Sequence, residues 1–88
     1  MAIEEVLSSK GRVKILKILA DIGELNISEI ARRAGLNYTT TNGHLTALER
    51  YGLVLHKRFG RIRIFRFNEC SPRAEMVRKL VDLWEQTK

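Results

Sequence analysis

The first 22 residues alternate apolar and polar positions at a spacing of three and four, which indicates amphipathic helices. The apolar members of this series are Ile3, Val6, Leu7, Val13, Ile15, Leu16, Ile18, Leu19 and Ile22. Gly11 interrupts the series, so residues 3–9 and 12–21 are expected to form either one helix or two. Gly23 is expected to end it, because glycine readily adopts the left-handed conformation that follows a helix.

Two further amphipathic segments follow, and a glycine separates them. The first begins with Asn26 in a capping-box spacing, with a glutamate three residues later, and it ends at Gly35. The second has Asn37 available as its cap and ends at Gly52. A helix, a tight turn at glycine and a second helix form a helix-turn-helix arrangement, which we expect over about residues 27–51.

The next segment has the pattern of two strands joined by a tight turn. Branched and aromatic residues dominate positions 53–55 and 62–67, and the turn falls near Gly60. The alternation in the second strand is imperfect, because Ile64 and Phe65 are adjacent and both apolar. Either one of them faces a partner subunit, or a residue of this hairpin is twisted out of register.

Ser71 and Pro72 make a favourable helix start, with serine as the cap and proline at the first helical position. The apolar band of the helix that follows is wider than one small domain usually covers. It is expected to pack against the N-terminal helix and against the same helix of a second chain. The residues predicted to form this dimer interface are Ile3, Val6, Leu7, Val77, Leu80, Val81 and Trp84.

These elements predict a mainly α fold with a small β-hairpin, in the α+β class. At 88 residues the chain is close to the size at which a single core is only just sufficient, so a core shared across a dimer would help. We expect one domain over residues 1–88. It would contain the helix-turn-helix, a hairpin over about residues 53–67 and a C-terminal dimerisation helix over about residues 72–87.

The charge is strongly basic, with 16 Lys and Arg against 10 Asp and Glu and a formal net charge of +6. Clustered positive charge favours polyanions, either nucleic acid or an acidic membrane surface. The single cysteine, Cys70, excludes an intrachain disulfide and suits a reducing compartment. Neither a signal peptide nor a membrane-spanning stretch is evident, so the sequence predicts a cytoplasmic, nucleoid-associated protein.

The second helix of the helix-turn-helix has a small, uncharged exposed face. A helix that served only solubility would carry Lys and Glu there, whereas Thr, Asn and Gly are poorer helix formers. Short hydrogen-bonding side chains suit contact with base edges in the DNA major groove, and the Asn42 amide is the best candidate because it can bond adenine N6 and N7 together. The predicted recognition residues are Tyr38, Thr39, Thr40, Asn42, Gly43 and Thr46.

Two of these residues allow more than one interpretation. Tyr38 lies at the helix start and also on the apolar stripe, and we favour a contact from its hydroxyl to a phosphate. Gly43 costs about 1 kcal/mol relative to alanine inside a helix. Either it permits close approach of the backbone to DNA, or it is a tolerated exposed site.

Two basic clusters are expected to contact the DNA backbone. Five basic residues without an acidic one between Val54 and Asn68 exceed what is needed to keep a sheet edge soluble. The predicted phosphate or minor-groove contacts of the hairpin are Lys57, Arg58, Arg61 and Arg63. Flanking phosphates would be contacted by Lys10, Arg12 and Lys14.

Several short motifs between residues 9 and 67 belong together. They are Ser9-Lys10-Gly11-Arg12-Val13-Lys14-Ile15-Leu16, Ile30-Ala31, Gly35-Leu36, Thr40, His44-Leu45, Leu48-Glu49, Gly52-Leu53-Val54, Gly60-Arg61 and Phe65. Through them the chain resembles the winged helix-turn-helix domain of the ArsR-like family of prokaryotic transcriptional regulators, and its small size and isoleucine-rich, basic composition resemble archaeal or archaeal-virus members. The resemblance implies a dimer with each recognition helix in a major groove and each basic wing at a minor groove or backbone.

The sequence departs from the family pattern in two places and lacks the features of its metal-sensing members. Thr41 stands where the family usually has Val or Ile, and Gly43 where it often has a long polar residue. The metal sensors use a cysteine pair on the helix before the recognition helix, or His and Asp clusters on the last helix. His44, His56 and Cys70 do not have ligand spacing, so we expect no metal or other cofactor and expect His44 to pack or to face a phosphate.

The sequence therefore predicts a double-stranded DNA-binding transcriptional regulator, in its simplest form a repressor that binds an inverted repeat as a homodimer. One alternative is an architectural DNA-binding protein that ignores sequence, and another is a protein-interaction module. An enzyme is disfavoured, because there is no glycine-rich phosphate loop, acid–base pair or nucleophile–histidine motif. No membrane partner or small-molecule ligand is evident.

Overall fold

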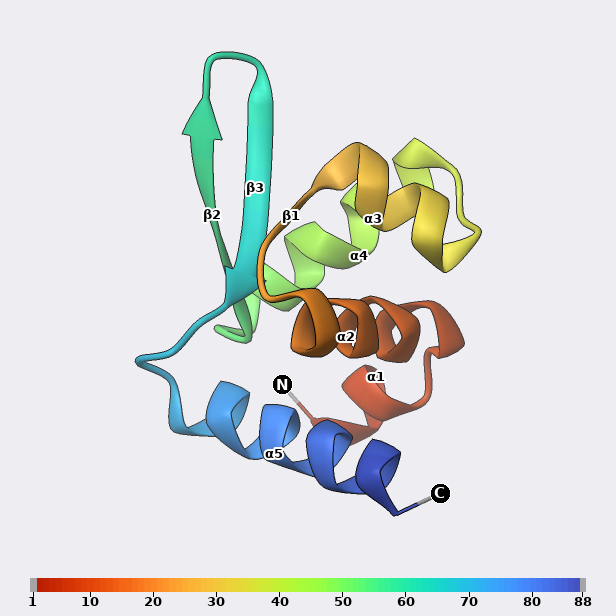
Figure 1. The fold of residues 1–88 in the computed structure, drawn as a ribbon, viewed down its shortest axis with the longest axis vertical. Coiled ribbons are helices and arrows are strands. Elements are labelled where there is room, and N and C mark those ends of the chain that lie inside the picture. Colours follow the sequence, from red (N-terminus) through yellow and green to blue (C-terminus); the bar gives the residue numbers. More distant parts are fainter. Residues whose placement is uncertain (1, 88) are drawn as a thin grey trace.

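A computed structural model describes residues 2–87, which form five helices and a three-stranded sheet (Figure 1). The elements are α1 (Ile3–Leu7), α2 (Lys10–Ile22), β1 (Leu25–Asn26), α3 (Ile27–Ala34), α4 (Tyr38–Arg50), β2 (Val54–Phe59), β3 (Ile62–Phe67) and α5 (Pro72–Gln86). The predicted α+β class and winged helix-turn-helix architecture are confirmed. Within this part of the chain no helix is long and apolar enough to cross a membrane.

The N-terminal apolar series forms two helices, and the break does not lie at Gly11. The chain leaves α1 at Ser8 and starts again after Ser9, whose side chain accepts a hydrogen bond from the backbone N–H of Arg12 at 3.2 Å. Because this cap satisfies an N–H that the first helical turn leaves unbonded, the new helix starts at Lys10. Gly11 therefore lies inside the first turn of α2.

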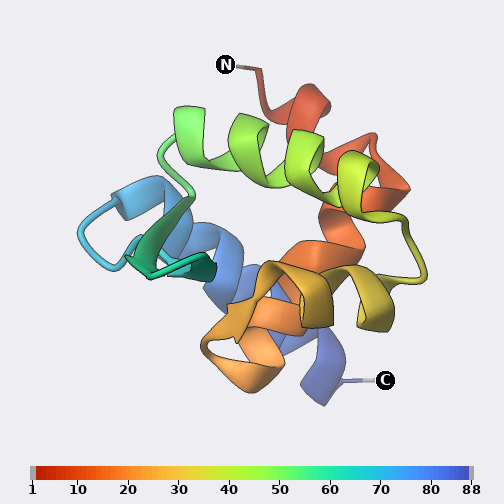
Figure 2. The same cartoon turned by 90° about the horizontal axis from the view of Figure 1, so that it is seen from above.

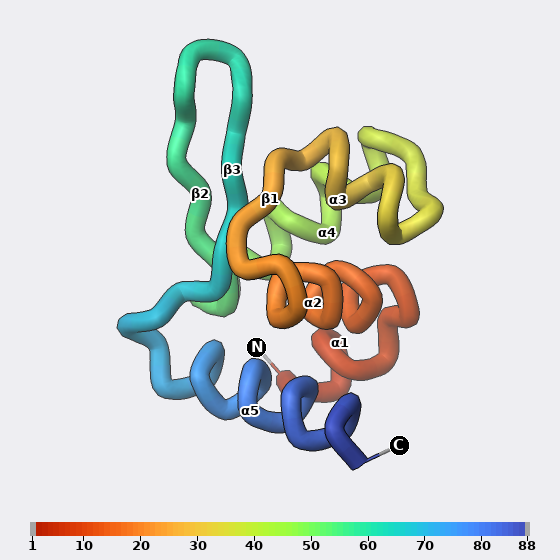
Figure 3. The backbone as a smooth tube through the Cα atoms, viewed as in Figure 1, coloured from red at the N-terminus to blue at the C-terminus, as the bar shows by residue number. Residues whose placement is uncertain are grey.

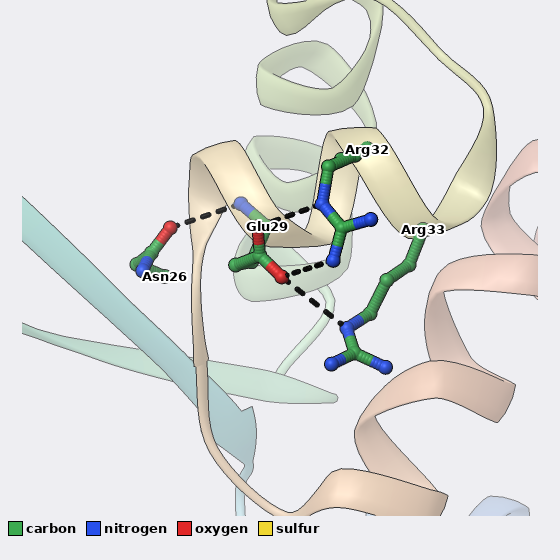
Figure 4. A network of polar contacts seen from close by, with 4 residues as sticks. All are labelled: Asn26, Glu29, Arg32 and Arg33. Atoms are coloured by element: carbon green, nitrogen blue, oxygen red, sulfur yellow. Dashed lines mark hydrogen bonds and ion pairs between the residues drawn. The ribbon is translucent and has the colours of Figure 1, made fainter.

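Both helices of the helix-turn-helix begin at the predicted caps. Asn26 accepts from the N–H of Glu29 at 2.9 Å, and Asn37 accepts from the N–H of Thr40 at 2.7 Å. Figure 4 shows that the Glu29 carboxylate turns to Arg32, at 2.6 and 2.8 Å, and to Arg33 at 3.6 Å. The hydrogen bond from Arg32 lowers the pKa of Glu29, so the negative charge at the start of α3 is kept to lower pH.

The hairpin spans the predicted residues, but its first strand is longer than predicted, and the sheet has a third strand that the sequence did not reveal. The strand order is β1-β3-β2, and the two residues of β1 pair with β3. The strand β2 starts at Val54 and continues to Phe59, past the predicted end at Leu55. Pairing between β2 and β3 is regular from Val54↔Phe67 to Phe59↔Ile62, so no residue is out of register.

This regular register explains why two apolar residues are adjacent in β3. Phe65 is buried in the core, whereas Ile64 lies half-buried on the opposite face of the sheet. Figure 3 shows the hairpin extending beyond the body of the molecule, with its tip at the far end from α5. At its base, one face of the hairpin therefore packs on the core, and the opposite face is partly exposed.

The core lies where α2, α3 and α4 meet the base of the sheet. Its largest fully buried side chains are Phe65, Ile15, Leu16, Leu19, Ile30, Leu45, Leu48, Val54 and Thr41. Seen from the hairpin end (Figure 2), α4 and the hairpin lie side by side, with α3 next to both. The helix α5 packs across α2 and the base of β3 on the other side of this core.

Candidate nucleic-acid interface

The outer face of α4 is formed by the small polar residues that the sequence indicated. Thr39, Thr40, Gly43 and Thr46 are exposed, and Asn42 is half-buried. A Cβ atom added at Gly43 would meet no atom within 4 Å, so this glycine stands on open surface. The core side of the helix contains Leu45 and Leu48, together with Thr41.

Thr41 and Tyr38 both lie on the stripe predicted to face the core, but only Thr41 is buried. Thr41 is fully buried, and its hydroxyl donates to the carbonyl of Asn37 at 2.9 Å, one turn earlier. Tyr38 is 52% exposed, so the core-stripe interpretation of this residue is wrong. Its hydroxyl instead faces β3, with Arg63 Nη2 at 3.5 Å.

Arg63 connects the hairpin to α4. Its Nη2 donates to Asn42 Oδ1 at 2.5 Å, and its guanidinium lies over the Phe65 ring at 5.5 Å from the centroid. Arg63 is half-buried, and it points toward α4 because it shares a face of β3 with Phe65. The sequence predicted that Arg63 contacts DNA. In the free protein its guanidinium is hydrogen-bonded to Asn42, the best candidate for reading a base.

A second bridge joins α4 to the base of the hairpin. His56 Nδ1 of β2 lies 2.5 Å from Glu49 Oε1, and the His56 ring packs against Phe65 with 5.1 Å between centroids. A shallow hollow beside this bridge is lined by Thr46, Glu49, Arg50, His56, Arg63 and Phe65. Sequence reasoning missed Glu49 and His56, because only the packing of β2 against α4 brings together these two residues, which are seven positions apart.

The basic residues of the hairpin differ in their surroundings. Lys57, Arg58 and Arg61 are exposed, and within residues 2–87 none of them forms an ion pair. Arg66, nearer the base, lies 3.6 Å from Glu24. The uncompensated positive charge is therefore concentrated toward the tip of the hairpin.

The predicted flanking residues separate into two kinds. Lys10 and Lys14 are exposed on α2. Arg12 is half-buried, and its Nη1 donates to the carbonyl of Glu5 at 2.5 Å. Arg12 thus ties α1 to α2 in the free protein, while the two lysines are open to solvent.

His44 packs between α4 and α2. A Cβ atom added at Gly11 would lie 2.7 Å from His44 Nε2, so the two helices approach closely at this glycine. Burial lowers the pKa of His44, and the nearby positive charge of Arg12 lowers it further. Of the two roles expected for this histidine, the structure supports packing.

The predicted dimer residues lie together on α1 and α5, with one exception. Val6 is buried in the chain's own core, so it belongs to the fold and not to the exposed surface. Leu80 is 49% exposed and Trp84 71% exposed, and the surface also includes Ile3, Leu7, Val77 and Val81. Two open grooves of about 410 and 350 Å³ border Leu80. Met76 and Leu83 add exposed apolar area that the sequence analysis had not assigned to an interface.

The possible metal ligands lie apart from one another. Cys70 is exposed in the connection after β3, while His44 and His56 contact different partners. Over residues 2–87 no group of three or more His, Cys, Asp or Glu side chains is placed to hold a metal ion.

A helix-turn-helix with an exposed polar second helix, and a basic hairpin fixed beside it, defines the winged helix-turn-helix class of DNA-binding proteins. Residues 9–55, more than half of the chain, match the family described as bacterial regulatory protein, arsR family. The chain therefore belongs to the ArsR family and is a DNA-binding transcriptional regulator, a class of proteins that are not enzymes.

Solved structures agree with this assignment. A homodimeric winged helix-turn-helix domain from Mycobacterium bovis, a possible ArsR-family regulator, is 32% identical, with a TM-score of 0.75 over 96% of this chain and 72% of that one. Reduced HlyU from Vibrio cholerae has the same fold at 24% identity, with a TM-score of 0.79 over 96% and 82% of the two chains. The repressor BigR from Xylella fastidiosa shares the fold at 22% identity, with a TM-score of 0.79 over 93% and 78%. No curated protein sequence matches the chain.

Proposed function

We propose that this regulator binds an inverted-repeat DNA site as a homodimer and represses transcription by occupying promoter DNA. The observation that carries the proposal is the exposed, uncharged face of α4 next to a hairpin rich in unpaired arginine and lysine. The small polar face suits base edges, and the basic hairpin suits phosphates. We expect such a protein to be cytoplasmic and associated with the nucleoid. Its placement among small archaeal or viral regulators stays a prediction.

Asn42 is the proposed reader of an adenine. An amide oxygen has two lone pairs, so Asn42 Oδ1 can keep the hydrogen bond from Arg63 and still accept from adenine N6. The Nδ2 group would then donate to adenine N7. Thr39 and Thr46 would contact neighbouring bases or thymine methyl groups, and Tyr38 a phosphate.

The exposed apolar surface of α1 and α5 supports the homodimer. Exposed Trp84 and Leu80 next to two grooves form an apolar patch that a second copy would bury. The Mycobacterium bovis relative is described as homodimeric. A two-fold dimer would place its two α4 helices in major grooves about one DNA turn apart, roughly 34 Å, which gives an inverted-repeat site.

Selection from a random duplex pool, with the bound fraction sequenced across a salt series, tests the proposal. Enrichment of an inverted repeat that persists near a physiological ionic strength, about 0.15 M, supports it. Tight binding at low salt without enrichment would mean an architectural protein. A protein that binds no duplex even at low salt would refute both readings and leave an interaction module.

Variants separate the two parts of the proposal. Asn42→Ala should abolish the preference for the selected site and keep non-specific binding, whereas Gln86→Ala, an exposed amide on α5, should change neither. Leu80→Glu should shift the protein to monomers in sedimentation, while Ile22→Glu, an exposed apolar site that lines neither groove, should not. An unchanged site preference in Asn42→Ala would remove Asn42 from its proposed role.

A further inference from the structure

The tip of the hairpin carries an exposed apolar pair. Phe59 and Ile62 are direct cross-strand partners on either side of the Gly60-Arg61 turn. Their exposed fractions are 60% and 54%. The turn has only two residues, with Gly60 at a φ of 60°, so this pair forms the end of the hairpin (Figure 3).

Packing of the core does not account for this exposed pair, whose contribution to the fold is limited to the contact between the two strands. Neither side chain belongs to the buried core or packs against it. Most of the other exposed large apolar residues lie on α1 and α5, at the opposite end of the molecule from the tip (Figure 1). A dimer formed through those helices would leave the tip uncovered, and the turn itself needs only Gly60.

The surroundings of the pair indicate a polyanion as its partner. Lys57, Arg58 and Arg61 lie within two positions of Phe59 or Ile62, are exposed and have no acidic neighbour between Val54 and Asn68. A partner that matches both the apolar pair and the basic residues beside it is an acidic polymer with apolar surface between its charged edges. Duplex DNA is such a polymer, because its grooves expose sugars and base edges between two rows of phosphates.

The tip is also connected to the recognition helix. Arg61 and Ile62 line a shallow hollow together with Tyr38 of α4 and Ser28 of α3. One residue further along β3, Arg63 is hydrogen-bonded to Asn42. A helix α4 seated in a major groove therefore brings the tip against the same duplex.

We propose that Phe59 and Ile62 form an apolar wedge that enters the minor groove beside the major groove occupied by α4. Arg58 and Arg61 hold the phosphates on either side of it. Apolar wedges of this kind partly unstack a base step and kink the duplex. Pyrimidine–purine steps deform most easily, so the wedge would add sequence preference outside the bases that α4 contacts. This inference rests on the proposed function.

The test uses the site obtained by selection, with fluorophores at its two ends to report the bend by energy transfer. Phe59→Ala should reduce the bend and lower the affinity roughly tenfold, which is the size expected for losing burial of one aromatic side chain. It should leave the salt dependence unchanged, because no charge is removed. Arg61→Ala should instead lower the slope of log affinity against log salt by about one and keep the bend.

Leu55→Ala is the matched control, since Leu55 lies on the same face of β2 as Phe59 but nearer the base. It should change neither the bend nor the affinity. Unchanged affinity and bend in both Phe59→Ala and Ile62→Ala would overturn the wedge, as would a loss of affinity without a change in bend. Failure of the unaltered protein to bind any duplex would instead overturn the proposed function.

Discussion

Replacing Arg63 by alanine removes the guanidinium that joins the hairpin to the recognition helix. Arg63 Nη2 donates to Asn42 Oδ1 at 2.5 Å, and the guanidinium also lies over Phe65. If this hydrogen bond positions Asn42 before DNA arrives, the two residues must be energetically coupled in the free protein. A double-mutant cycle of Arg63→Ala and Asn42→Ala measures that coupling directly.

The size of the coupling follows from the burial of the pair. A hydrogen bond from a charged donor contributes about 1.5–3 kcal/mol. Arg63 and Asn42 are both half-buried, so solvent screening reduces the expected coupling to about 1 kcal/mol. The cation–π contact with Phe65 adds roughly 0.5–1 kcal/mol to the cost of Arg63→Ala but cancels in the cycle. The better helix propensity of alanine, which partly offsets the cost of Asn42→Ala, cancels as well.

The assay is urea denaturation of the four proteins at one protein concentration, because the stability of the proposed dimer would depend on concentration. Arg63→Lys serves as the control that keeps the charge but lacks the forked, planar donor group. It should recover only part of the coupling. Each variant changes the free energy of unfolding by a measured amount. If the changes in the two single variants sum to the change in the double variant within about 0.3–0.5 kcal/mol, the positioning role of Arg63 is refuted.

Two further predictions concern the core side of α4. Because burial and Arg12 lower the pKa of His44, the unfolded chain binds more protons than the folded chain once the pH falls below the ordinary histidine value of about 6.5. The free energy of unfolding should therefore fall as the pH is lowered through that value, and His44→Gln should weaken this dependence; a stability that rises on acidification in the unaltered protein relative to His44→Gln would contradict it. Thr41→Val should leave the free energy of unfolding unchanged or raise it by up to about 1 kcal/mol, because the Asn37 carbonyl keeps its bond from the Thr41 N–H at 3.0 Å after the buried hydroxyl is lost. A loss of more than about 1 kcal/mol on thermal or urea denaturation would show that the hydroxyl has a structural role.

Local sequence signals predicted most of the fold because each acts over a few residues. The caps at Asn26 and Asn37 satisfy N–H groups three positions later, so they could be identified without any tertiary information. The two-residue strand β1 could not be predicted, since it is defined only by pairing with β3 some 40 positions later in the chain. Gly11 left it open whether residues 3–22 form one helix or two, whereas the break is set by the Ser9 cap two positions earlier.

The sequence predicted which residues form the candidate interface, but not which of them contact one another. The polar face of α4 follows from helical periodicity, which fixes which side chains point away from the core. The bridges from Arg63 to Asn42 and from His56 to Glu49 depend on which face of each strand meets α4. That choice is set by the buried position of Phe65, and the adjacent apolar pair at residues 64 and 65 left it ambiguous in the sequence.

These bridges give the wing and the recognition helix a fixed relation before DNA binds. The base of the hairpin is held by the buried Phe65 and by the His56–Glu49 contact, and its middle is held by Arg63. A contact that is already ordered in the free protein adds no ordering cost on binding, so more of its interaction energy appears as affinity. Because of the same rigidity, the proposed position of α4 in a major groove would determine where the wing tip meets the duplex. Base reading by Asn42 and groove contact by Phe59 should therefore depend on one another, although the two side chains lie on different elements.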